Sequence, residues 1–494
     1  MKYYILFLSI LALWLFSGCS DDQGNYDYED LNTITIDSIK ENYTVIRFDS
    51  IEPIEPVLTF KFDPHQDLSF EWKVNYKTVS DKKILNVAID APLGTNYATL
   101  FVTDNHNGVK YYKDFKIKVN TSYSDGLLIL SEKTDKSAML SYLRRDKKNG
   151  QVINEVFELE NPRQDHLGNY PQQIAYSQNM QTRSYNYYII CKEGIKKIAT
   201  LNANTMQLEK VDNETTVMGG YTGDFYPTML TQSPTGGFAV SEGKAFTYNA
   251  FGSGNLNRPI PGDYELAWTD FNHIWGSYAQ FGYDRKNHRF VVFTQTEDDM
   301  YSYDQVSTYH EIEGFEGQIV ETAGLDFVAG GATGDAYSLE EKKAILCNKA
   351  ENKAYFYTLN TTLDLNAQQT GVKAVPPYGL TLDMTKENFL SEQGVYKFAS
   401  LNRYWYIANG RTITRLFWNE GGTTKTFTLP AEAKGEVTAM AFDEDETELY
   451  VGLYDAGSTN EYKGAIAILN PETGELLEYI VNAGEKIVDL FRKE

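Results

Sequence analysis

The sequence predicts an all-β chain, in which a β-sandwich is followed by a β-propeller of about seven blades. Three observations lead to this prediction. The 494 residues are too many for one ordinary globular core. Short aromatic and β-branched runs separated by polar turns recur along most of the chain, and helical periodicity is nearly absent. The run from Ala279 to Tyr303 reads as three strands with two turns, and a similar run extends from Met440 to Leu453 with a further strand at Ala465 to Leu469.

The first 18 residues read as a lipoprotein signal peptide. Lys2 is followed by an apolar run of 14 residues from Tyr3 to Phe16, which is too short to cross a bilayer comfortably. The run leads into Leu15-Phe-Ser-Gly-Cys19, which resembles a bacterial lipobox, although Phe16 departs from the usual small or branched residue. The resemblance implies that the mature chain begins at Cys19 and is held in outer-membrane lipid by acyl chains on that cysteine. A plain cleaved signal peptide is the alternative.

Residues 19–32 read as a lipidated tether. Ser20-Asp-Asp22 looks like the acidic tag that sends lipoproteins of Bacteroidetes to the outer face of the outer membrane. This resemblance implies a lipid-anchored protein that faces the outside of the cell. The polar and aromatic stretch Gly24-Asn-Tyr-Asp-Tyr28 follows without periodicity.

Residues 33–122 carry strand runs at the spacing of a β-sandwich. The expected strands are Thr33–Ile36, Tyr43–Phe48, Val57–Phe60, Leu68–Val74, Ile84–Ile89, Tyr97–Thr103 and Tyr111–Val119. Alternation along Leu68–Val74 places Trp72 on the core face, so we expect a core tryptophan and not a ligand platform.

Tyr97-Ala-Thr-Leu-Phe-Val-Thr-Asp104, followed by Gly108, resembles the penultimate strand of PKD-type, immunoglobulin-like domains. Together with Gly24–Tyr28 behind a lipobox, it makes the chain similar to the PKD-like surface lipoproteins of Bacteroidetes. The resemblance implies a PKD-like sandwich that acts as a spacer for a propeller. It also implies partners of the SusC/SusD type, a TonB-dependent transporter with its lipoprotein lid, in the uptake of glycan or oligopeptide.

Residues 123–494 carry the repeat. An apolar strand recurs every 45 to 60 residues, close to the span of a four-stranded blade, and six or eight blades remain possible if the longer steps hold insertions. The recurring strands begin at Leu127, Tyr187, Phe238, Phe290, Ala344, Tyr404 and Leu449. Because such an array must close, we expect the last run, Lys486–Phe491, to pair into the first blade.

The longest segments that do not fit the repeat are 161–181, 204–223, 251–275 and 366–393. Residues 251–275 are rich in Gly and Pro and then in aromatic residues, which can stack on sugar rings or on peptide side chains. The candidate ligand-binding residues are Tyr264, Trp268, Phe271 and Trp275. The alternative is that these side chains pack the loop onto the blades. Small residues at 323–334, which match no phosphate loop, are expected to let strands crowd the axis.

Composition and motifs disfavour several functions. The net charge of −23 repels phosphate backbones, so nucleic-acid binding is not expected. Cys191 and Cys347 end apolar runs, which favours two buried side chains over a disulfide or metal site. The six scattered histidines have no zinc spacing, and we expect no metal and no cofactor.

No nucleophile elbow or His-Glu-x-x-His motif occurs, so we expect no catalytic residues. Acidic turns such as Glu297–Asp299 and Asp443–Glu446 are expected to be ordinary solvated hairpins. We therefore expect a non-catalytic accessory of an uptake system. A propeller glycan hydrolase or lyase, and an adhesin or assembly lipoprotein with protein partners only, are the alternatives.

Overall fold

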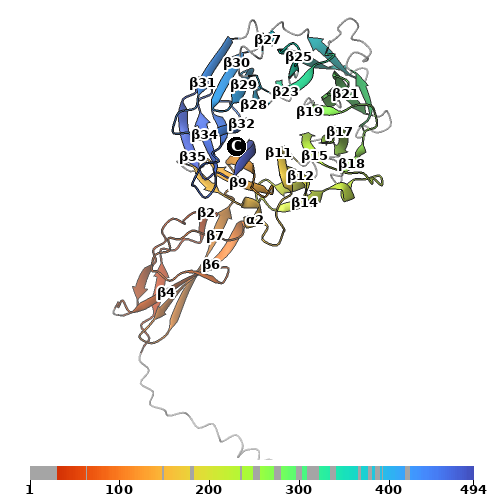
Figure 1. Ribbon diagram of the computed structural model, residues 1–494. Coiled ribbons are helices and arrows are strands. Elements are labelled where there is room, and N and C mark those ends of the chain that lie inside the picture. Colours follow the sequence, from red (N-terminus) through yellow and green to blue (C-terminus); the bar gives the residue numbers. More distant parts are fainter. Residues whose placement is uncertain are drawn as a thin grey trace, which may run out of the picture. The chain divides into compact units, whose positions relative to one another are not determined.

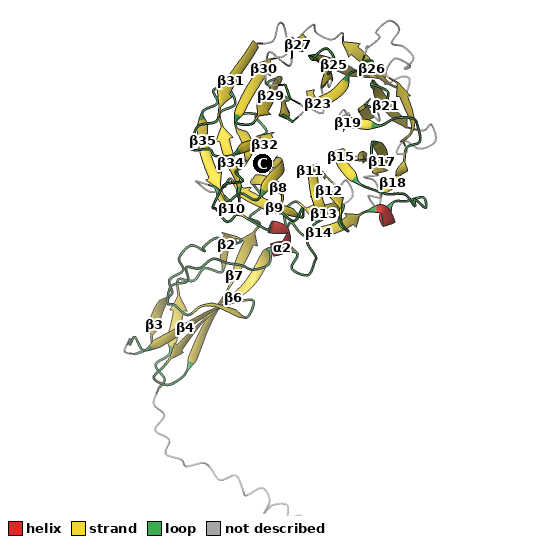
Figure 2. Cartoon of the chain, in the orientation of Figure 1, coloured by secondary structure: helices red, strands yellow, loops and turns green. Residues whose placement is uncertain are grey.

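The structure, a computed structural model, describes residues 30–62, 64–146, 150–178, 183–233, 236–248, 256–271, 280–295, 303–308, 322–333, 341–364, 369–375, 381–383, 390–391, 393–417 and 423–493. The chain forms two compact units that divide between Asn120 and Thr121. Within the described residues, helix is confined to α2 (Val156–Glu160) and one 3-10 turn at Glu214–Thr216 (Figure 2). The prediction of an all-β chain is confirmed.

The first unit is a β-sandwich. Its strands are β1 (Ile34–Asp37), β2 (Asn42–Ile46), β3 (Val57–Phe60), β4 (Leu68–Val74), β5 (Lys77–Ser80), β6 (Gly94–Asp104) and β7 (Lys110–Asn120) (Figure 1). The large sheet has the order β2-β7-β6-β4-β5, and β1 pairs with β3 in a small second sheet. β2 runs parallel to β7, whereas the other pairs are antiparallel.

Trp72 lies at the centre of the sandwich core, as the alternation along β4 predicts. Its side chain is fully buried, and its Nε1 donates a hydrogen bond of 2.8 Å to the carbonyl oxygen of Lys82. Phe115 of β7 meets the Trp72 ring edge-on, with 5.9 Å between the ring centres. Trp72 is therefore a packing residue.

One predicted strand of the sandwich is absent, and one observed strand is not predicted. Residues Ile84–Ile89 form isolated bridges at Leu85 and Ala88 and no continuous strand. Leu85 is nevertheless buried. The apolar alternation in this run therefore reflects burial of side chains and not a continuous hydrogen-bonded strand. β5 was not expected because its residues are polar. It forms because Asn75–Tyr76 is a two-residue turn with positive φ at both positions, the conformation that a tight hairpin requires.

The second unit is a β-propeller, whose described strands group into seven sheets. The strands of the first four sheets are β8 (Gly126–Glu132), β9 (Ala138–Arg144), β10 (Gln151–Ile153), β11 (Asn169–Gln178), β12 (Tyr185–Glu193), β13 (Ile198–Asn202), β14 (Leu208–Asp212), β15 (Pro227–Ser233), β16 (Gly236–Ser241), β17 (Lys244–Tyr248), β18 (Leu256–Pro259), β19 (Leu266–Phe271), β20 (Gln280–Asp284), β21 (Arg289–Gln295) and β22 (Tyr303–Thr308). The remaining strands are β23 (Asp326–Thr333), β24 (Glu341–Asn348), β25 (Lys353–Asp364), β26 (Gln369–Val375), β27 (Thr381–Asp383), β28 (Val395–Ala399), β29 (Tyr404–Asn409), β30 (Thr412–Phe417), β31 (Thr423–Thr428), β32 (Glu436–Phe442), β33 (Leu449–Tyr454), β34 (Gly464–Leu469), β35 (Leu476–Val481) and β36 (Lys486–Lys493).

The sheets lie around a ring, and each has one strand nearest the axis (Figure 1). Their strand orders are β36-β8-β9-β10, β11 to β14, β15 to β18, β19 to β22, β23 to β26 with β27 also paired to β25, β28 to β31, and β32 to β35. The strands nearest the axis are β36, β11, β15, β19, β23, β28 and β32, and each of them contacts the next one around the ring. The prediction of a sandwich followed by a propeller is confirmed.

The last strand closes the ring. β36 pairs antiparallel with β8, from Lys486 opposite Glu132 to Lys493 opposite Gly126. It also contacts β32 on one side and β11 on the other. The predicted pairing of the C-terminal run with the first blade is confirmed, and the structure adds that β36 is the innermost strand of that sheet.

In the fourth sheet, the sequence pattern identifies the third strand as the recurring apolar strand, although the second strand holds that position in the other sheets. The recurring apolar strand is the second strand of its sheet everywhere except there, where Phe290 lies in the third strand, β21. The second strand is β20, a shorter run that contains Phe281 and Tyr283. β21 (Arg-Phe-Val-Val-Phe-Thr-Gln) has the stronger strand propensity, which explains the offset.

Both faces of some propeller strands are covered. Every residue of β9 and of β34 is buried, as expected of a strand whose sheet has neighbours on both sides. Cys191 of β12 and Cys347 of β24 are also buried, and they lie in different sheets. This agrees with their interpretation as small core side chains.

Candidate functional site

The aromatic segment 251–275 is not an insertion into the repeat. Its described residues contain β18, the outermost strand of the third sheet, and β19, the innermost strand of the fourth. Segment 161–181 likewise contains β11, segment 204–223 contains β14, and segment 366–393 contains β26 and β27. The interpretation of these four segments as insertions outside the repeat is therefore wrong, because inner and outer strands have a weaker apolar signal than the strands between them.

Tyr264 connects β18 to β19 and is 1% exposed. Its hydroxyl donates to the carbonyl oxygen of Ile260 at 2.7 Å and accepts from the backbone N–H of Ala245 at 3.3 Å. The Lys244 ammonium lies 4.4 Å from the centre of the ring and donates to the carbonyl oxygens of Gly262 and Tyr264. Burial raises the pKa of Tyr264 to about 12, so its hydroxyl remains a donor at neutral pH. The residue holds the connection in place.

Trp268 of β19 packs between the fourth and fifth sheets and is 8% exposed. Its ring stacks on Phe327 of β23, with 5.7 Å between ring centres and 15° between planes. Phe281 of β20 meets the same ring edge-on. Because Trp268 and Tyr264 are buried, their predicted stacking on a ligand is corrected, and both belong to the packing of the propeller.

The other predicted site residues are placed only in part. Phe271 is the last residue of β19. Trp275 and the predicted lipidation site, Cys19, lie outside the described residues. The four aromatic residues therefore do not form one described surface.

Two glycines of β23 make room for aromatic rings from the neighbouring inner strands. A Cβ atom at Gly330 would lie 2.3 Å from the Trp268 indole, and one at Gly331 would lie 2.6 Å from the Phe398 Cβ atom. Real side chains do not approach this closely, so any larger residue at 330 would displace the tryptophan. This agrees with the prediction that small residues in 323–334 let the inner strands crowd together.

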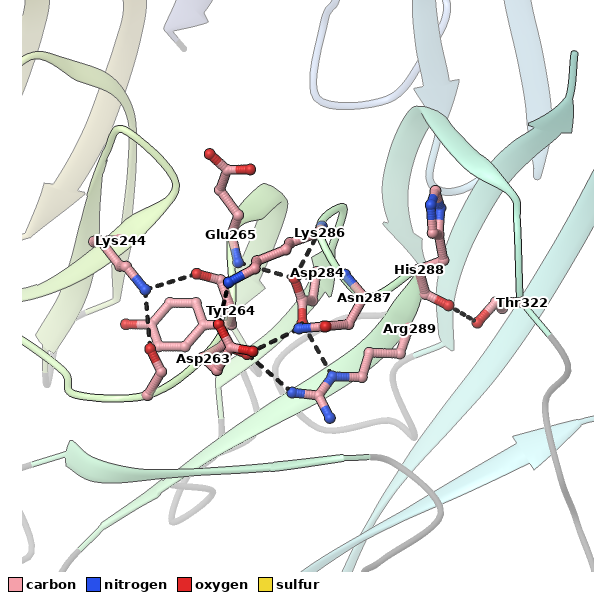
Figure 3. Close-up of polar contacts among 11 residues, drawn as sticks. Lys244, Asp263, Tyr264, Glu265, Asp284, Lys286, Asn287, His288, Arg289 and Thr322 are labelled. Carbon is pink, nitrogen blue, oxygen red and sulfur yellow. Dashed lines mark hydrogen bonds and ion pairs between the residues drawn. The ribbon is translucent and has the colours of Figure 1, made fainter.

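Figure 3 shows a polar network around Asp284, the fully buried last residue of β20. The Asp284 carboxylate accepts hydrogen bonds from Glu265 N (2.8 Å), Asn287 Nδ2 (2.8 Å) and Arg289 Nε (3.0 Å). Asn287 Nδ2 and Arg289 Nη2 also donate to the carbonyl oxygen of Asp263. The network holds the turn after β20 against the segment that leads into β19. Its donors form hydrogen bonds with both oxygens of the Asp284 carboxylate.

The acidic turn of the seventh sheet contains a second carboxylate of this kind. Glu446 is 6% exposed, which corrects the expectation of a solvated turn at this residue. Its oxygens accept from Ser400 Oγ at 3.0 Å, from Leu401 N at 2.9 Å and from Asn402 N at 2.8 Å. Since these donors belong to the turn after β28, Glu446 joins two neighbouring sheets.

Side chains of two inner strands bind the backbone of the next inner strand. Asp489 Oδ2 of β36 accepts from Ile174 N of β11 at 2.8 Å, and Gln173 Oε1 of β11 accepts from Leu230 N of β15 at 2.8 Å. Both acceptors lie at a register shift of their strand. An inner strand has an open edge toward the axis, and these side chains supply partners there. Burial raises the pKa of Asp489, and the charge of Lys397 opposes that shift.

Charged residues concentrate where the first and last sheets meet. Arg145 pairs with Glu478 at 2.6 Å and with Glu448 at 3.1 Å. Both glutamates belong to the part of the chain that forms the seventh sheet. Arg492 of β36 pairs with Asp125 at 2.7 Å. These ion pairs reinforce the junction that β36 closes.

Lys493, the last residue of β36, is 9% exposed. Its ammonium donates to Tyr123 O at 2.9 Å, to Ala203 O at 2.8 Å and to Asn204 Oδ1 at 3.0 Å. Burial lowers the pKa of Lys493 to about 8. These three uncharged oxygens stabilise the ammonium, and they tie the end of the ring to its beginning.

The polar clusters described above have structural roles, because each joins strands or turns. Within the described ranges, no group of three or more His, Cys, Asp or Glu side chains is placed to hold a metal ion. Nor does any helix in the described part of the chain have the length and apolar character needed to cross a bilayer.

A sequence model of the PKD-like family matches residues 19–171, which include the whole sandwich and the first strands of the propeller. No curated protein matches the chain. The match supports the PKD-like character of the N-terminal part.

Several solved structures are similar in fold. A quinonprotein alcohol dehydrogenase-like protein from Bacteroides thetaiotaomicron shares 12% identity, with 92% of this chain and 97% of that chain covered and a TM-score of 0.48. A functionally unknown protein from Desulfotomaculum acetoxidans shares 12% identity, with coverages of 75% and 100% and a TM-score of 0.44. PorZ, a surface component of the type-IX secretion system of Porphyromonas gingivalis, shares 10%, with coverages of 78% and 58% and a TM-score of 0.24. At such identities these are likenesses of fold alone.

Proposed function

We propose that the protein is a lipid-anchored, surface-facing lipoprotein of the outer membrane that binds a nutrient glycan or oligopeptide. It acts as a non-catalytic accessory of a SusC/SusD-type, TonB-dependent uptake system. The observation that carries the proposal is the starting point of the PKD-like match, which begins at Cys19. The resemblance of Leu15–Cys19 to a lipobox implies the same residue as the first of the mature chain. Two independent patterns thus support the same mature N-terminus.

The tether length supports a position close to the membrane. Residues 19–29 precede the first described residue, Asp30. An extended chain covers at most about 3.3–3.6 Å per residue, so the sandwich begins within roughly 40 Å of the acylated cysteine. At that distance the sandwich can contact other proteins of the outer membrane or their ligands.

The buried carboxylates support a non-catalytic role. Burial favours acidic residues as acid or base groups, and in the described part of the ring Glu160 and Asp212 are buried as well as Asp284 and Glu446. We take Asp284 and Glu446 as the examples. Both instead accept several hydrogen bonds from backbone and side-chain donors of the turns that they join. The propeller is therefore proposed to act as a rigid binding frame.

The proposal is tested by immunoprecipitating the full-length protein from detergent-solubilised outer membrane. We expect a TonB-dependent transporter and its lipoprotein lid to co-purify with it. A Cys19→Ala variant, which cannot be acylated, should leave the membrane fraction and lose both partners. Isolation of the protein without any transporter would contradict the uptake role, and specific turnover of a polysaccharide would contradict the non-catalytic one.

A further inference from the structure

The large sheet of the sandwich packs on the core with one face and leaves the other face open. Along β6 and β7 buried and outward residues alternate. On the outward face Tyr97 is 69% exposed and Tyr112 is 67% exposed. Phe101 lies opposite Tyr112 in the register, with 6.4 Å between the ring centres. Three aromatic rings thus lie on one side of a sheet that no other sheet of the sandwich covers.

Lysines lie beside these rings. The Lys116 ammonium is 5.9 Å from the centre of the Tyr97 ring, and the Lys73 ammonium is 5.4 Å from that of Phe101. Alternation along β4 and β7 gives this face four lysines, Lys73, Lys110, Lys116 and Lys118, and two carboxylates, Glu71 and Asp114. Lys73 pairs with Glu71 at 3.3 Å. Although the whole chain has a net charge of −23, lysines outnumber carboxylates on this face, which complements an anionic ligand.

Polar groups separate the rings. Thr99 lies between Tyr97 and Phe101 on β6, and its hydroxyl donates to Asp114 Oδ1 at 2.7 Å. Tyr97 and Phe101 are four residues apart in an extended strand, so their Cα atoms are about 13 Å apart. An elongated ligand is needed to contact both. Hydroxyls and carboxylates between the rings favour a polar ligand over the acyl region of a membrane, which would select apolar residues there.

We propose that this outer face, formed by β4, β6 and β7, binds acidic glycan chains. Tyr97, Phe101 and Tyr112 stack on the sugar rings, and the neighbouring lysines pair with carboxylate or sulfate groups of the chain. The inference deepens the proposed function, on which it rests for the role of the glycan as a nutrient. It moves the ligand site from the propeller to the sandwich and names the class of glycan.

The test measures binding to the full-length protein purified in detergent, by microscale thermophoresis. The probes are polygalacturonate and chondroitin sulfate, with fully methyl-esterified polygalacturonate as a neutral ligand of the same backbone. We expect at least one acidic polymer to bind and the methyl ester not to bind. The affinity should fall as sodium chloride is raised, because salt screens exposed charges.

The double variant Tyr97→Ser/Tyr112→Ser should lose affinity by about tenfold or more, as truncation of central interface aromatics commonly does. Lys73→Gln/Lys116→Gln should also weaken binding and flatten its dependence on salt. Phe62→Ser is the matched control. Phe62 is 49% exposed, and the Lys61 ammonium lies 5.0 Å from its ring. It follows β3 of the small sheet, so its replacement should leave the affinity unchanged.

Three outcomes would overturn the inference: no acidic polymer binds, the methyl ester binds equally well, or the Tyr97/Tyr112 variant keeps its affinity. Vesicles of phosphatidylglycerol in phosphatidylcholine form a further arm. If the same variants release the protein from vesicles while neither acidic polymer binds, the face contacts anionic lipid and not glycan. Co-purification of a transporter without binding of either polymer would contradict this inference and leave the proposed function intact.

Discussion

The two domains use their aromatic residues in opposite ways. In the propeller, Tyr142, Tyr187 and Trp405 are buried between sheets. In the sandwich, Trp72 is buried, whereas Tyr97 and Tyr112 of the same sheet lie on its outer face and are more than half exposed. The difference follows from the architecture, because a propeller sheet has a neighbour on each face and a sandwich sheet has a neighbour on only one.

This difference shows where an aromatic residue of this chain can reach a ligand. An aromatic side chain on an inner propeller strand, such as Trp268, meets the next sheet before it meets solvent. An aromatic side chain on an open sheet face needs no loop to carry it outward. The comparison predicts large stability effects in the propeller and small ones on the outer face of the sandwich.

The largest effect is expected from deleting residues 485–494. The deletion removes β36, which buries Ile487 and Leu490 and pairs with β8. Opening the ring should cost an amount comparable to the whole stability of a domain, about 5–15 kcal/mol. Calorimetry should show the propeller transition lost or strongly lowered while the sandwich transition stays in place. Two unchanged transitions would disprove the need for closure.

The next effect is expected from Gly330→Ala. The new Cβ would lie 2.3 Å from the Trp268 ring, and such overpacking costs about 1–3 kcal/mol. Urea unfolding of the variant measures the loss in the propeller transition. The double variant Gly330→Ala/Trp268→Ala should lose less stability than the sum of the losses measured for the two single variants, since the clash between the new Cβ atom and the tryptophan ring is absent there. Simple additivity would show that the two residues do not meet.

A smaller, pH-dependent effect is expected at Lys493. Below about pH 8 its amine is charged in both states, and the folded protein bears the full cost of the buried charge. Between pH 8 and the ordinary lysine pKa of 10.5, the folded state has released the proton and the unfolded state still binds it. This residue therefore makes the free energy of unfolding rise with pH in that window. Lys493→Met removes the contribution, so the melting temperature of the wild type minus that of the variant should increase from pH 7.5 to 9.5. A constant difference would place the lysine pKa outside the window.

The smallest effect is expected from Tyr97→Ser. The side chain is 69% exposed, and surface substitutions of this kind usually change stability by less than about 0.5 kcal/mol. Both calorimetric transitions should stay in place, in contrast to Gly330→Ala. A marked drop in the sandwich transition would mean that Tyr97 stabilises the sheet itself, through its contact with Lys116.

Much of the fold could be predicted because strongly apolar strands recur at regular intervals. The second strands of most sheets, the core position of Trp72 and the closing run at Lys486–Phe491 all follow from local patterns. Several inner and outer strands, β11, β14, β18, β19 and β26, do not stand out as strands in the sequence because their side chains are mixed. The Gly- and Pro-rich start of 251–275 resembled a loop, although it leads directly into β18 and β19.

The candidate site was harder to predict, since burial depends on the neighbouring sheet. Nothing near Trp268 in the sequence reveals that Gly330, 62 positions further along, leaves space for its ring. The outer face of the sandwich could have been found from alternation. In the run Lys110-Tyr-Tyr-Lys-Asp-Phe-Lys-Ile-Lys118, alternation places Tyr112 on the opposite face of the strand from the buried Phe115 and Ile117.

The innermost strand of the first sheet, β36, follows every other described strand of the ring in the sequence. Until residues 486–493 are made, β8 has an open edge, and pairing it requires contact across more than 350 residues of sequence. Such long-range pairing is slow compared with the formation of local hairpins. The ring of a nascent chain therefore stays open until β36 has been made, whereas the hairpins of the other sheets can form earlier.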